Sequence, residues 1–329
     1  MTHHAPDFET ALRRASMLKT AFGPVIGDAL EDASVIEIMV NPDGALWIER
    51  HGKGLAEEAK RLKGADVERI IRLVASQIGF DCDKARPIVS AELPTGERFE
   101  GVLPPVAPSP CFSIRKAAGR VISLSEYVGA GIMTGADALI LKSAIARRQN
   151  ILIAGGASSG KTTLANALLA EIAAIEDRIV ILEDTRELRC DARDVVALRT
   201  SPTVSLEALV RSTMRLRPDR IIVGEVRGGE ALDLLKAWNT GHPGGIATVH
   251  ANSAAAALTR LEQLIGERTT HIPCQLIADA IDLVVFISRG PGGRRVEEIL
   301  RVEGFDHNGY RLAKPNSLEL VVINEGATS

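Results

Sequence analysis

One short glycine-rich segment constrains the fold of this chain more than any other feature. Residues 155–162 read GGASSGKT and fit the pattern G-x-x-x-x-G-K-[ST]. Residues 150–154 (NILIA) form the apolar run of a strand, and residues 163–174 repeat apolar side chains at helical spacing. A strand, a glycine-rich loop and a helix in this order predict a phosphate-binding loop rather than a chance turn that ends in lysine and threonine.

The residues of this loop suit a polyphosphate for physical reasons. Glycines let backbone amides turn inward on phosphate oxygens, and the following helix adds the partial positive charge of its N-terminus. Lys161 can reach the outer phosphates, and the hydroxyl of Thr162 can ligate Mg²⁺. The predicted loop consists of Gly155, Gly156, Ala157, Ser158, Ser159, Gly160, Lys161 and Thr162.

Composition narrows the class of protein. A length of 329 residues suits about two domains. A net charge of −3 and an aromatic content of 3% disfavour direct nucleic-acid binding, because such proteins need basic surfaces and stacking platforms. The four cysteines lie far apart and form no C-x-x-C pair, so we expect buried thiols in a reducing compartment.

No segment resembles a signal peptide or a membrane span. The N-terminus lacks a basic stretch followed by an apolar one. The longest uncharged run, residues 237–259, contains glycines, His242, Pro243 and His250, which a membrane helix would not tolerate together. We therefore expect a cytoplasmic protein whose membrane contact, if it has one, is peripheral or made through a partner.

The first 117 residues predict a small α+β domain. Helical spacing covers residues 7–30 and 66–78, and strand patterns at 35–40 and 45–50 flank the turn sequence NPDG. Further short strands are expected at 88–93, 98–103 and 111–115, which together favour an antiparallel sheet. A change in composition near residue 117, followed by a helical pattern, places the linker at residues 118–125.

Residues 126–329 predict an α/β domain with a mainly parallel sheet. Strands are expected near 150–154, 178–183, 220–224, 245–250 and 282–288, with helices near 161–174, 205–215, 228–240 and 253–266. Strands that alternate with helices favour a parallel sheet covered on both faces. Residues 294–302 and 310–312 predict a terminal hairpin.

Polar residues follow three of the expected strands. Glu183 ends the second strand, Glu225 follows the third, and His250 ends the fourth. Function collects at the carboxyl ends of parallel strands, where a carboxylate could hold Mg²⁺ through water or polarise an attacking water. Each has an ordinary alternative: Glu183 could cap the next helix, Glu225 could be solvated, and a histidine alone is more often structural.

Read together, several segments resemble the secretion-ATPase superfamily, the hexameric motors of type II secretion, type IV secretion and type IV pili. They are GGASSGKTTLANALL, ILEDTREL (181–188), residues 215–254 and RLEQLI (260–265), in the order Walker A, Asp box, Walker B and His box. In the first domain, VIEIMVNPDGALWIER, LPTGERFEGVLPPV and CFSIRK resemble the conjugative-transfer branch, the TrbB-type ATPases. The resemblance spans residues 18–286.

The resemblance implies a RecA-like ATPase domain and roles for individual residues. ATP and Mg²⁺ would bind the loop, which then extends to Thr163, and the metal would be held by Thr162 with water on Glu183 or Glu225. Glu225 would be the general base, Glu183 the acidic residue of the Asp box, and His250 the His-box residue. Lys161 would be the fourth catalytic residue. From the first domain Arg115 would reach the nucleotide, and Arg199, Arg217 and Arg227 are candidates for phosphate or subunit contacts.

Two positions depart from the common pattern. Gly224 stands where many phosphate-loop enzymes have an aspartate linked to Mg²⁺, and Ala157-Ser158 replaces the Thr-Gly common in the family loop. Since the backbone amides bind the phosphates, neither change should abolish binding, although Ser158 restricts a position where glycine is freer.

The resemblance implies a homohexameric ring that powers a conjugative type IV secretion apparatus and docks on its inner-membrane components. A nucleic-acid translocase and a nucleotide-gated scaffold with little turnover are the alternatives. The type II branch is disfavoured because its four-cysteine zinc insertion is absent from the sequence.

Overall fold

The structure, a computed structural model, describes residues 8–50, 52–116, 121–201 and 203–315, with the side chains of residues 8–15 left out. The chain separates into two compact units, residues 1–119 and 120–329, and each is treated by itself. The linker expected at 118–125 lies partly outside the described residues, and helix α3 (Leu124–Gly129) begins inside it. Within the described residues no helix is both long and apolar enough to cross a membrane.

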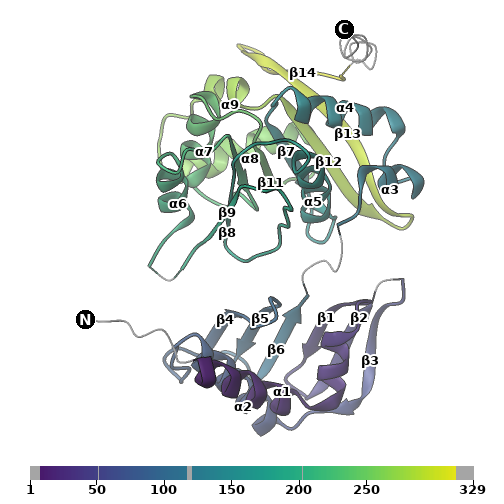
Figure 1. Ribbon diagram of the computed structural model, residues 1–329, viewed down its shortest axis with the longest axis vertical. Helices are drawn as coiled ribbons and strands as arrows, with labels where there is room; N and C mark the ends of the chain where they lie inside the picture. Colours follow the sequence, from purple (N-terminus) through teal and green to yellow (C-terminus); the bar gives the residue numbers. More distant parts are fainter. Residues whose placement is uncertain (1–7, 51, 117–120, 202, 316–329) are drawn as a thin grey trace. The chain divides into compact units, whose positions relative to one another are not determined.

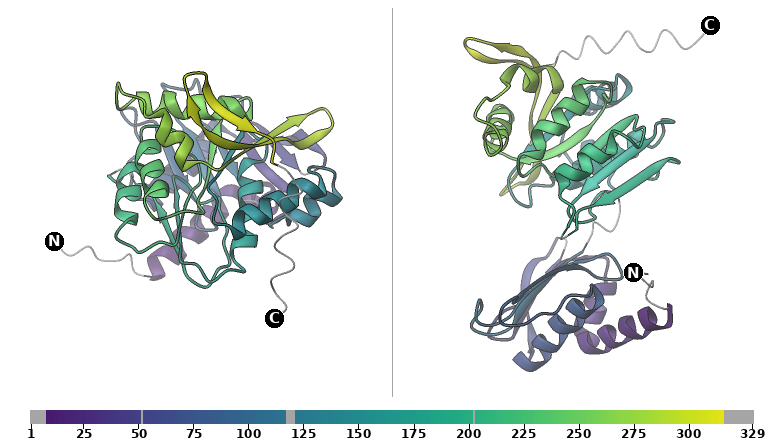
Figure 2. Two further views of the ribbon diagram at one scale, coloured as in Figure 1. Left: turned by 90° about the horizontal axis from the view of Figure 1, so that it is seen from above. Right: turned by 90° about the vertical axis from the view of Figure 1, so that its left-hand side faces the viewer.

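The first unit is an antiparallel sheet with two helices on one of its faces (Figures 1 and 2). The strand order in the described residues is β3-β2-β1-β6-β5-β4, and each neighbouring pair is antiparallel. The expected α+β domain is therefore present. Its elements are α1 (Phe8–Glu31), β1 (Val35–Val40), β2 (Ala45–Arg50), β3 (Gly54–Arg61), α2 (Gly64–Gln77), β4 (Ile88–Glu92), β5 (Arg98–Val102) and β6 (Cys111–Arg115).

Helical spacing and turn chemistry explain how this unit is held together. On α2, Val67, Ile70, Ile71 and Val74 recur every three or four residues and are all buried in the core of the unit. The turn between β1 and β2 needs Gly44, whose φ is 82° and whose missing Cβ would lie 2.2 Å from a backbone oxygen. Helix α1 is broken at its glycine-proline pair, residues 23–24.

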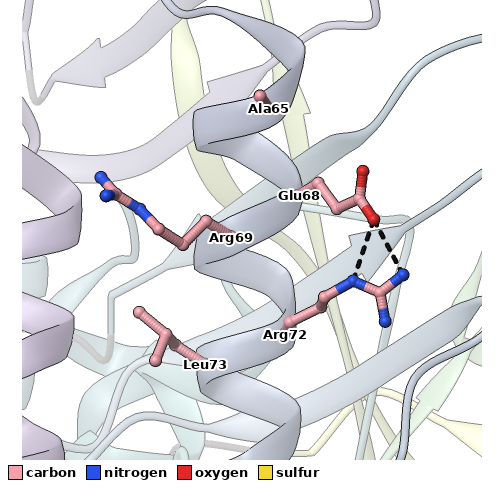
Figure 3. A pocket seen from close by; sticks show the side chains of 5 residues that line it. All are labelled: Ala65, Glu68, Arg69, Arg72 and Leu73. Atoms are coloured by element: carbon pink, nitrogen blue, oxygen red, sulfur yellow. Dashed lines mark hydrogen bonds and ion pairs between the residues drawn. The ribbon is translucent and has the colours of Figure 1, made fainter.

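The outer face of α2 carries a shallow groove that contains none of the expected site residues. Figure 3 shows Glu68 paired with Arg72, whose Nε donates to the carboxylate at 2.9 Å. Arg69 and Leu73 lie on the other side of the helix in this view. Both paired side chains are largely exposed, so this contact contributes little to stability. The groove is lined by Ala65, Glu68, Arg69, Arg72 and Leu73.

The second unit is a larger sheet with strand order β14-β13-β12-β7-β11-β10-β8-β9 in the described residues. The neighbouring pairs along β12-β7-β11-β10-β8-β9 are all parallel. The pairs β12-β13 and β13-β14 are antiparallel. The mainly parallel sheet and the terminal hairpin are thus confirmed. Its strands are β7 (Ile151–Gly155), β8 (Ile179–Glu183), β9 (Val195–Arg199), β10 (Arg220–Val223), β11 (Ile246–His250), β12 (Leu283–Gly290), β13 (Gly293–Asp306) and β14 (Gly309–Ala313).

Helices cover both faces of this sheet, as the alternating pattern predicted (Figure 1). One core lies between the sheet and α6 to α9, and the other between the sheet and α3 to α5. Because both faces are covered, β7, β8 and β10 are buried along their whole length, and β11 is buried up to its last residue, His250. The helices are α4 (Gly135–Ala146), α5 (Lys161–Ile172), α6 (Leu206–Thr213), α7 (Glu230–Asn239), α8 (Ala254–Gly266) and α9 (Cys274–Ala280).

A buried ionic cluster ties together the amino ends of these strands. Arg220 is only 1% exposed, and its Nε donates to Asp177 at 2.6 Å while its other nitrogens donate to the carbonyls of Gly244 and Ile145. Arg148 pairs with the other carboxylate oxygen of Asp177. The cluster joins α4, β10 and the loops before β8 and β11, so it fixes the sheet from the edge opposite to the predicted site.

Candidate functional site

The glycine-rich loop connects β7 to α5 as predicted, and its glycines are required by close contacts. Gly160 precedes the first residue of α5 with a φ of 104°, in the left-handed region that favours glycine. A Cβ on Gly155 would lie 2.4 Å from the backbone oxygen of Ile287 on β12, whereas nothing lies within 4 Å of one on Gly156. Ser158 adopts a φ of 55°, so the departure from the family loop places a side chain in a strained position.

The Lys161 side chain lies beneath the loop. It is 8% exposed, and its Nζ donates to the backbone oxygens of Gly155 at 3.0 Å and Gly156 at 2.9 Å. The same ammonium lies 3.4 Å from Nδ1 of His250. The cation is therefore placed between the loop and the end of β11, the strand next to β7.

The three expected strand-end residues gather on neighbouring strands. Glu183 ends β8, Glu225 follows β10, and His250 ends β11, and these strands are adjacent and parallel. His250 Nε2 lies 2.6 Å from Glu225 Oε1, a distance at which the two would form an ion pair only with a protonated ring. Within the described part of the chain that oxygen is buried and accepts no hydrogen bond. A line of polar contacts thus runs from the loop to the end of β10, through Lys161, His250 and Glu225.

Arg227 holds the other oxygen of the Glu225 carboxylate. Its Nε donates to Glu225 Oε2 at 2.7 Å, and its guanidinium lies 3.5 Å from Asp184. The Arg227 backbone amide donates to Glu230, at the start of α7, at 2.7 Å. Glu225 is therefore oriented by a cation whose own position is fixed by the next helix, a relation that the sequence pattern did not indicate.

Burial and charge set the protonation of His250. Burial lowers its pKa below the ordinary value, Lys161 lowers it further, and Glu225 opposes both effects. The imidazole is therefore neutral at pH 7, with one nitrogen able to accept from Lys161 and the other able to donate. A neutral ring in this place can respond to a charge that enters beside Lys161.

Glu183 is a deeply buried carboxyl group. It is 5% exposed, and its Oε1 accepts from the backbone amides of Glu187 and Leu188, each at 2.9 Å. Burial raises its pKa to about 7, although the two amide bonds favour the charged form. A Cβ at position 224 would lie 3.0 Å from Glu183 Cγ, so Gly224, the second departure from the common pattern, leaves room for this side chain.

Glu187 is a site residue that sequence reasoning missed. Its Oε2 accepts from the Thr162 hydroxyl at 3.1 Å, and its backbone oxygen accepts from Asn166, one turn further along α5, at 3.1 Å. Asn166 in turn accepts from the Arg189 amide at 2.8 Å. The segment after β8 is thus fastened to the helix that follows the loop. Glu187 lies between strands and outside any periodic pattern, so its position in the Asp-box segment was the one available signal.

The remaining arginines lie in different places. Arg199 ends β9 and is in register with Glu183, at the edge of the sheet where the loop lies. Arg217 precedes β10, so it lies near the opposite edge, with an exposed side chain and a φ of 54°. Arg115 ends β6 in the first unit, in register with Glu37 and Arg98. Its contact with a nucleotide remains a prediction.

Comparison with known proteins places the chain in a family. Residues 20–289 match the family described as type II/IV secretion system protein. The chain is 52% identical over 303 residues to a probable conjugal transfer protein TrbB from Sinorhizobium fredii, with 91% of this chain and 93% of the relative covered. It is also 52% identical over 302 residues to the conjugal transfer protein TrbB of Rhizobium radiobacter, with 91% and 93% covered.

A solved structure agrees at the level of the fold. The Legionella pneumophila ATPase DotB has a TM-score of 0.57 and 20% identity, with 94% of this chain and 84% of that chain covered. The loop, the strand-end residues and these relatives lead to one conclusion. The chain belongs to the type II/IV secretion system protein family and is a secretion ATPase of the TrbB type, a P-loop enzyme that hydrolyses ATP.

Proposed function

We propose that this chain is the motor of a conjugative type IV secretion system and works as a homohexameric ring at the cytoplasmic face of the inner membrane. The relatives named conjugal transfer protein TrbB, at 52% identity, support the conjugative assignment. The ring would dock on inner-membrane components of the apparatus, and its membrane contact would be peripheral. It would use the cycle of ATP hydrolysis to drive assembly of the apparatus or passage of its substrate.

The observation that carries this proposal is the line formed by Lys161, His250 and Glu225 beside the loop. Residues 155–163 would bind the phosphates of ATP through backbone amides and the start of α5, with Lys161 on the outer phosphates. Glu225 would accept the proton of a water that attacks the γ-phosphorus, while ADP departs. His250, neutral and in reach of both, would link the state of the phosphates to Glu225.

Arg227 adds a condition to this chemistry. One oxygen of the Glu225 carboxylate already accepts from the Arg227 guanidinium, so that oxygen is less available to accept a proton from water. Arg227 is also drawn to Asp184 on the other side. In the proposed cycle it would move toward Asp184 or the phosphates and release Glu225, which would make water activation depend on the state of the site.

The residues present fit Mg²⁺. The Thr162 hydroxyl already points at the Glu187 carboxylate, and a hydroxyl with a nearby carboxylate is a donor set that the ion prefers. Bound Mg²⁺ would supply positive charge to the phosphate oxygens. Glu183 and Glu225 were the carboxylates expected to hold the metal's water, but Glu183 accepts two amides and Glu225 is paired with Arg227. We therefore propose that Thr162 and Glu187 hold the ion and its water.

Assembly would complete the site. A cation supplied by the first unit or by a neighbouring subunit stabilises charge in the transition state only when it is in place. Arg115, exposed at the end of β6, is the proposed cation, and Arg199 and Arg217 are proposed contacts between subunits. Hydrolysis would then change the angle between the two units, because each would contact the same nucleotide.

The mass of the purified protein with and without ATP, measured beside steady-state hydrolysis, tests this part of the proposal. We expect a hexamer in ATP, and we expect Arg115→Gln to assemble while turnover falls about 100-fold, the usual scale for losing one charge-stabilising donor. Arg98→Gln, a change to its neighbour on β5, serves as the control. A monomer that hydrolyses ATP at full rate would contradict the ring. Turnover stimulated by DNA would favour a translocase, and binding without turnover would favour a scaffold.

A further inference from the structure

The hairpin of β12 and β13 lies directly against the phosphate-binding loop. The backbone oxygen of Ile287 occupies the place that a Cβ on Gly155 would need, and Ile287 Cδ1 lies 3.6 Å from the position of a Cβ on Gly160. Ile287 is fully buried and belongs to the core shared with α3, α4 and α5. One face of this hairpin therefore continues from the core to the loop.

Two arginines follow on that face, where the core ends. Ile287 is opposite Val296 in the register, and two residues further along Arg289 is opposite Arg294. Side chains alternate between the faces of a strand, so both arginines share the face of Ile287, and Arg295 lies on the other face. The β12–β13 hairpin therefore carries two cationic side chains on the face that continues to the loop.

Arg294 reaches the loop itself. Its Cδ and Nε lie 3.0 Å and 3.3 Å from the position of a Cβ on Gly160, the residue before Lys161. Its Nε is buried and has no hydrogen-bond partner in the described residues. Burial raises the pKa of Tyr127 on α3 to about 12, and the charge of Arg294 lowers it in part, so the cation is close to a buried phenol. A buried donor without a hydrogen-bond partner is unfavourable.

We propose that Arg294 is a nucleotide-binding residue whose guanidinium contacts a phosphate group of the nucleotide held by the loop, with Arg289 opposite adding positive charge. The inference rests on the proposed nucleotide site and adds to it a cation from the β12–β13 hairpin. A guanidinium binds phosphate strongly because its planar fork offers charged donors. Such a contact would give the buried Nε of Arg294 a hydrogen-bond acceptor.

A purely structural role for Arg294 makes a different prediction. If the side chain only supported the loop, its removal would lower the melting temperature of the protein without ligand. If its guanidinium instead serves a bound phosphate, removal would leave that temperature unchanged and weaken ligand binding. The two roles are therefore separated by the ligand-free protein, before any activity is measured.

The test compares Arg294→Gln with Arg295→Gln, its neighbour on the other face, in the full-length protein. Calorimetric titration with ADP and thermal shift with inorganic pyrophosphate are the readouts. We expect Arg294→Gln to weaken ADP about tenfold, as for the loss of one charge-assisted hydrogen bond, and to reduce the shift by pyrophosphate. Arg294→Lys should recover part of the affinity, and Arg295→Gln should match the wild type.

Equal ADP affinity in Arg294→Gln and the wild type would overturn the inference while leaving the proposed function intact. So would a lower melting temperature of ligand-free Arg294→Gln with an unchanged pyrophosphate shift. Failure of the wild type to bind ADP would instead contradict the proposed nucleotide site, and the inference with it. An effect on pyrophosphate alone would show an anion site that does not serve the nucleotide.

Discussion

Glu183 shows how one buried carboxyl group links the site to pH. Its folded-state pKa of about 7 lies above the ordinary value of 4.5, so between these two values the folded protein binds more protons than the unfolded one. Stability contributed by Glu183 is therefore present at low pH and is lost as pH rises through about 7. The loss approaches about 3 kcal/mol, from 1.4 kcal/mol per pKa unit.

Replacing Glu183 by glutamine should remove this loss. The amide oxygen can still accept from the Glu187 and Leu188 amides, so we expect Glu183→Gln to be more stable than the wild type at pH 8 and similar at pH 4.5. Urea denaturation at both pH values measures the difference. Glu176→Gln, an exposed carboxylate in the loop after α5, should show no such trend. A difference that shrinks as pH rises would contradict the buried-acid account.

Gly155 and Gly156 provide a matched pair of loop variants. Gly155→Ala places a methyl group 2.4 Å from a backbone oxygen that cannot move without disturbing β12, whereas Gly156→Ala meets open space. We expect Gly155→Ala to lower the free energy of unfolding by about 1–3 kcal/mol, the usual cost of overpacking. Gly156→Ala should stay within about 0.5 kcal/mol. Thermal denaturation of the ligand-free proteins distinguishes them, and equal melting temperatures would contradict this contact.

The sequence predicted the positions of some residues of the site but not of others. Glu225 and His250 follow buried strands, and that position alone predicted that they meet at one edge of the sheet. The contacts of Glu187 and Arg294 depend on a loop conformation and on a hairpin more than 130 residues beyond the loop. No periodicity links such positions, so only the folded chain brings them to the loop.

At the scale of elements, the buried cluster of Arg220, Asp177 and Arg148 carries a strong prediction. Arg220→Met leaves the Asp177 carboxylate, itself 2% exposed, with the partly exposed Arg148 as its remaining ion-pair partner among the described residues. Breaking a buried pair on one side typically costs about 3–5 kcal/mol, so we expect a loss of that order in chemical denaturation. Restoring neutrality with Asp177→Asn in the same chain should recover part of it.

The control for this prediction is an exposed pair in the same unit. Lys142 Nζ lies 3.1 Å from Glu171, and both side chains are partly solvated. Lys142→Met should change stability by less than about 1 kcal/mol. If Arg220→Met and Lys142→Met were equally mild, the cluster would not be what fixes the amino ends of the strands.

Elements with a clear period were predictable and polar edge elements were not. Helices α5 and α8 and the central parallel strands have apolar spacing that fixes their type, and they appear where expected. Strand β3 (GLAEEAKR) is exposed along nearly its whole length, and β9 is an edge strand that is at best half-buried. Neither has the burial that produces an alternating pattern, since hydrogen bonding to a neighbouring strand holds them in place.

At the scale of the whole molecule, the two units have separate cores, and each unit has its own pattern of helices and strands in the sequence. The first core joins α1, α2 and an antiparallel sheet, and the second unit has a core on each face of its sheet. From the sequence we predict domains at residues 1–117 and 126–329, because each sheet type leaves its own pattern. Ring assembly and the movement of the units depend on contacts with other copies and with nucleotide, which remain proposals.

The central claim is that Lys161 and Glu225 serve one ATP-hydrolysing site in different ways. Lys161 would bind the phosphates, whereas Glu225 would act on the attacking water. Its most direct test measures ATP affinity and steady-state hydrolysis together in the wild type, Lys161→Ala and Glu225→Gln. We predict that Glu225→Gln binds ATP as the wild type does but turns it over at least about 100-fold more slowly. Lys161→Ala should lose both binding and turnover. Turnover that persists at the wild-type rate in Glu225→Gln, or in Lys161→Ala, would contradict the account.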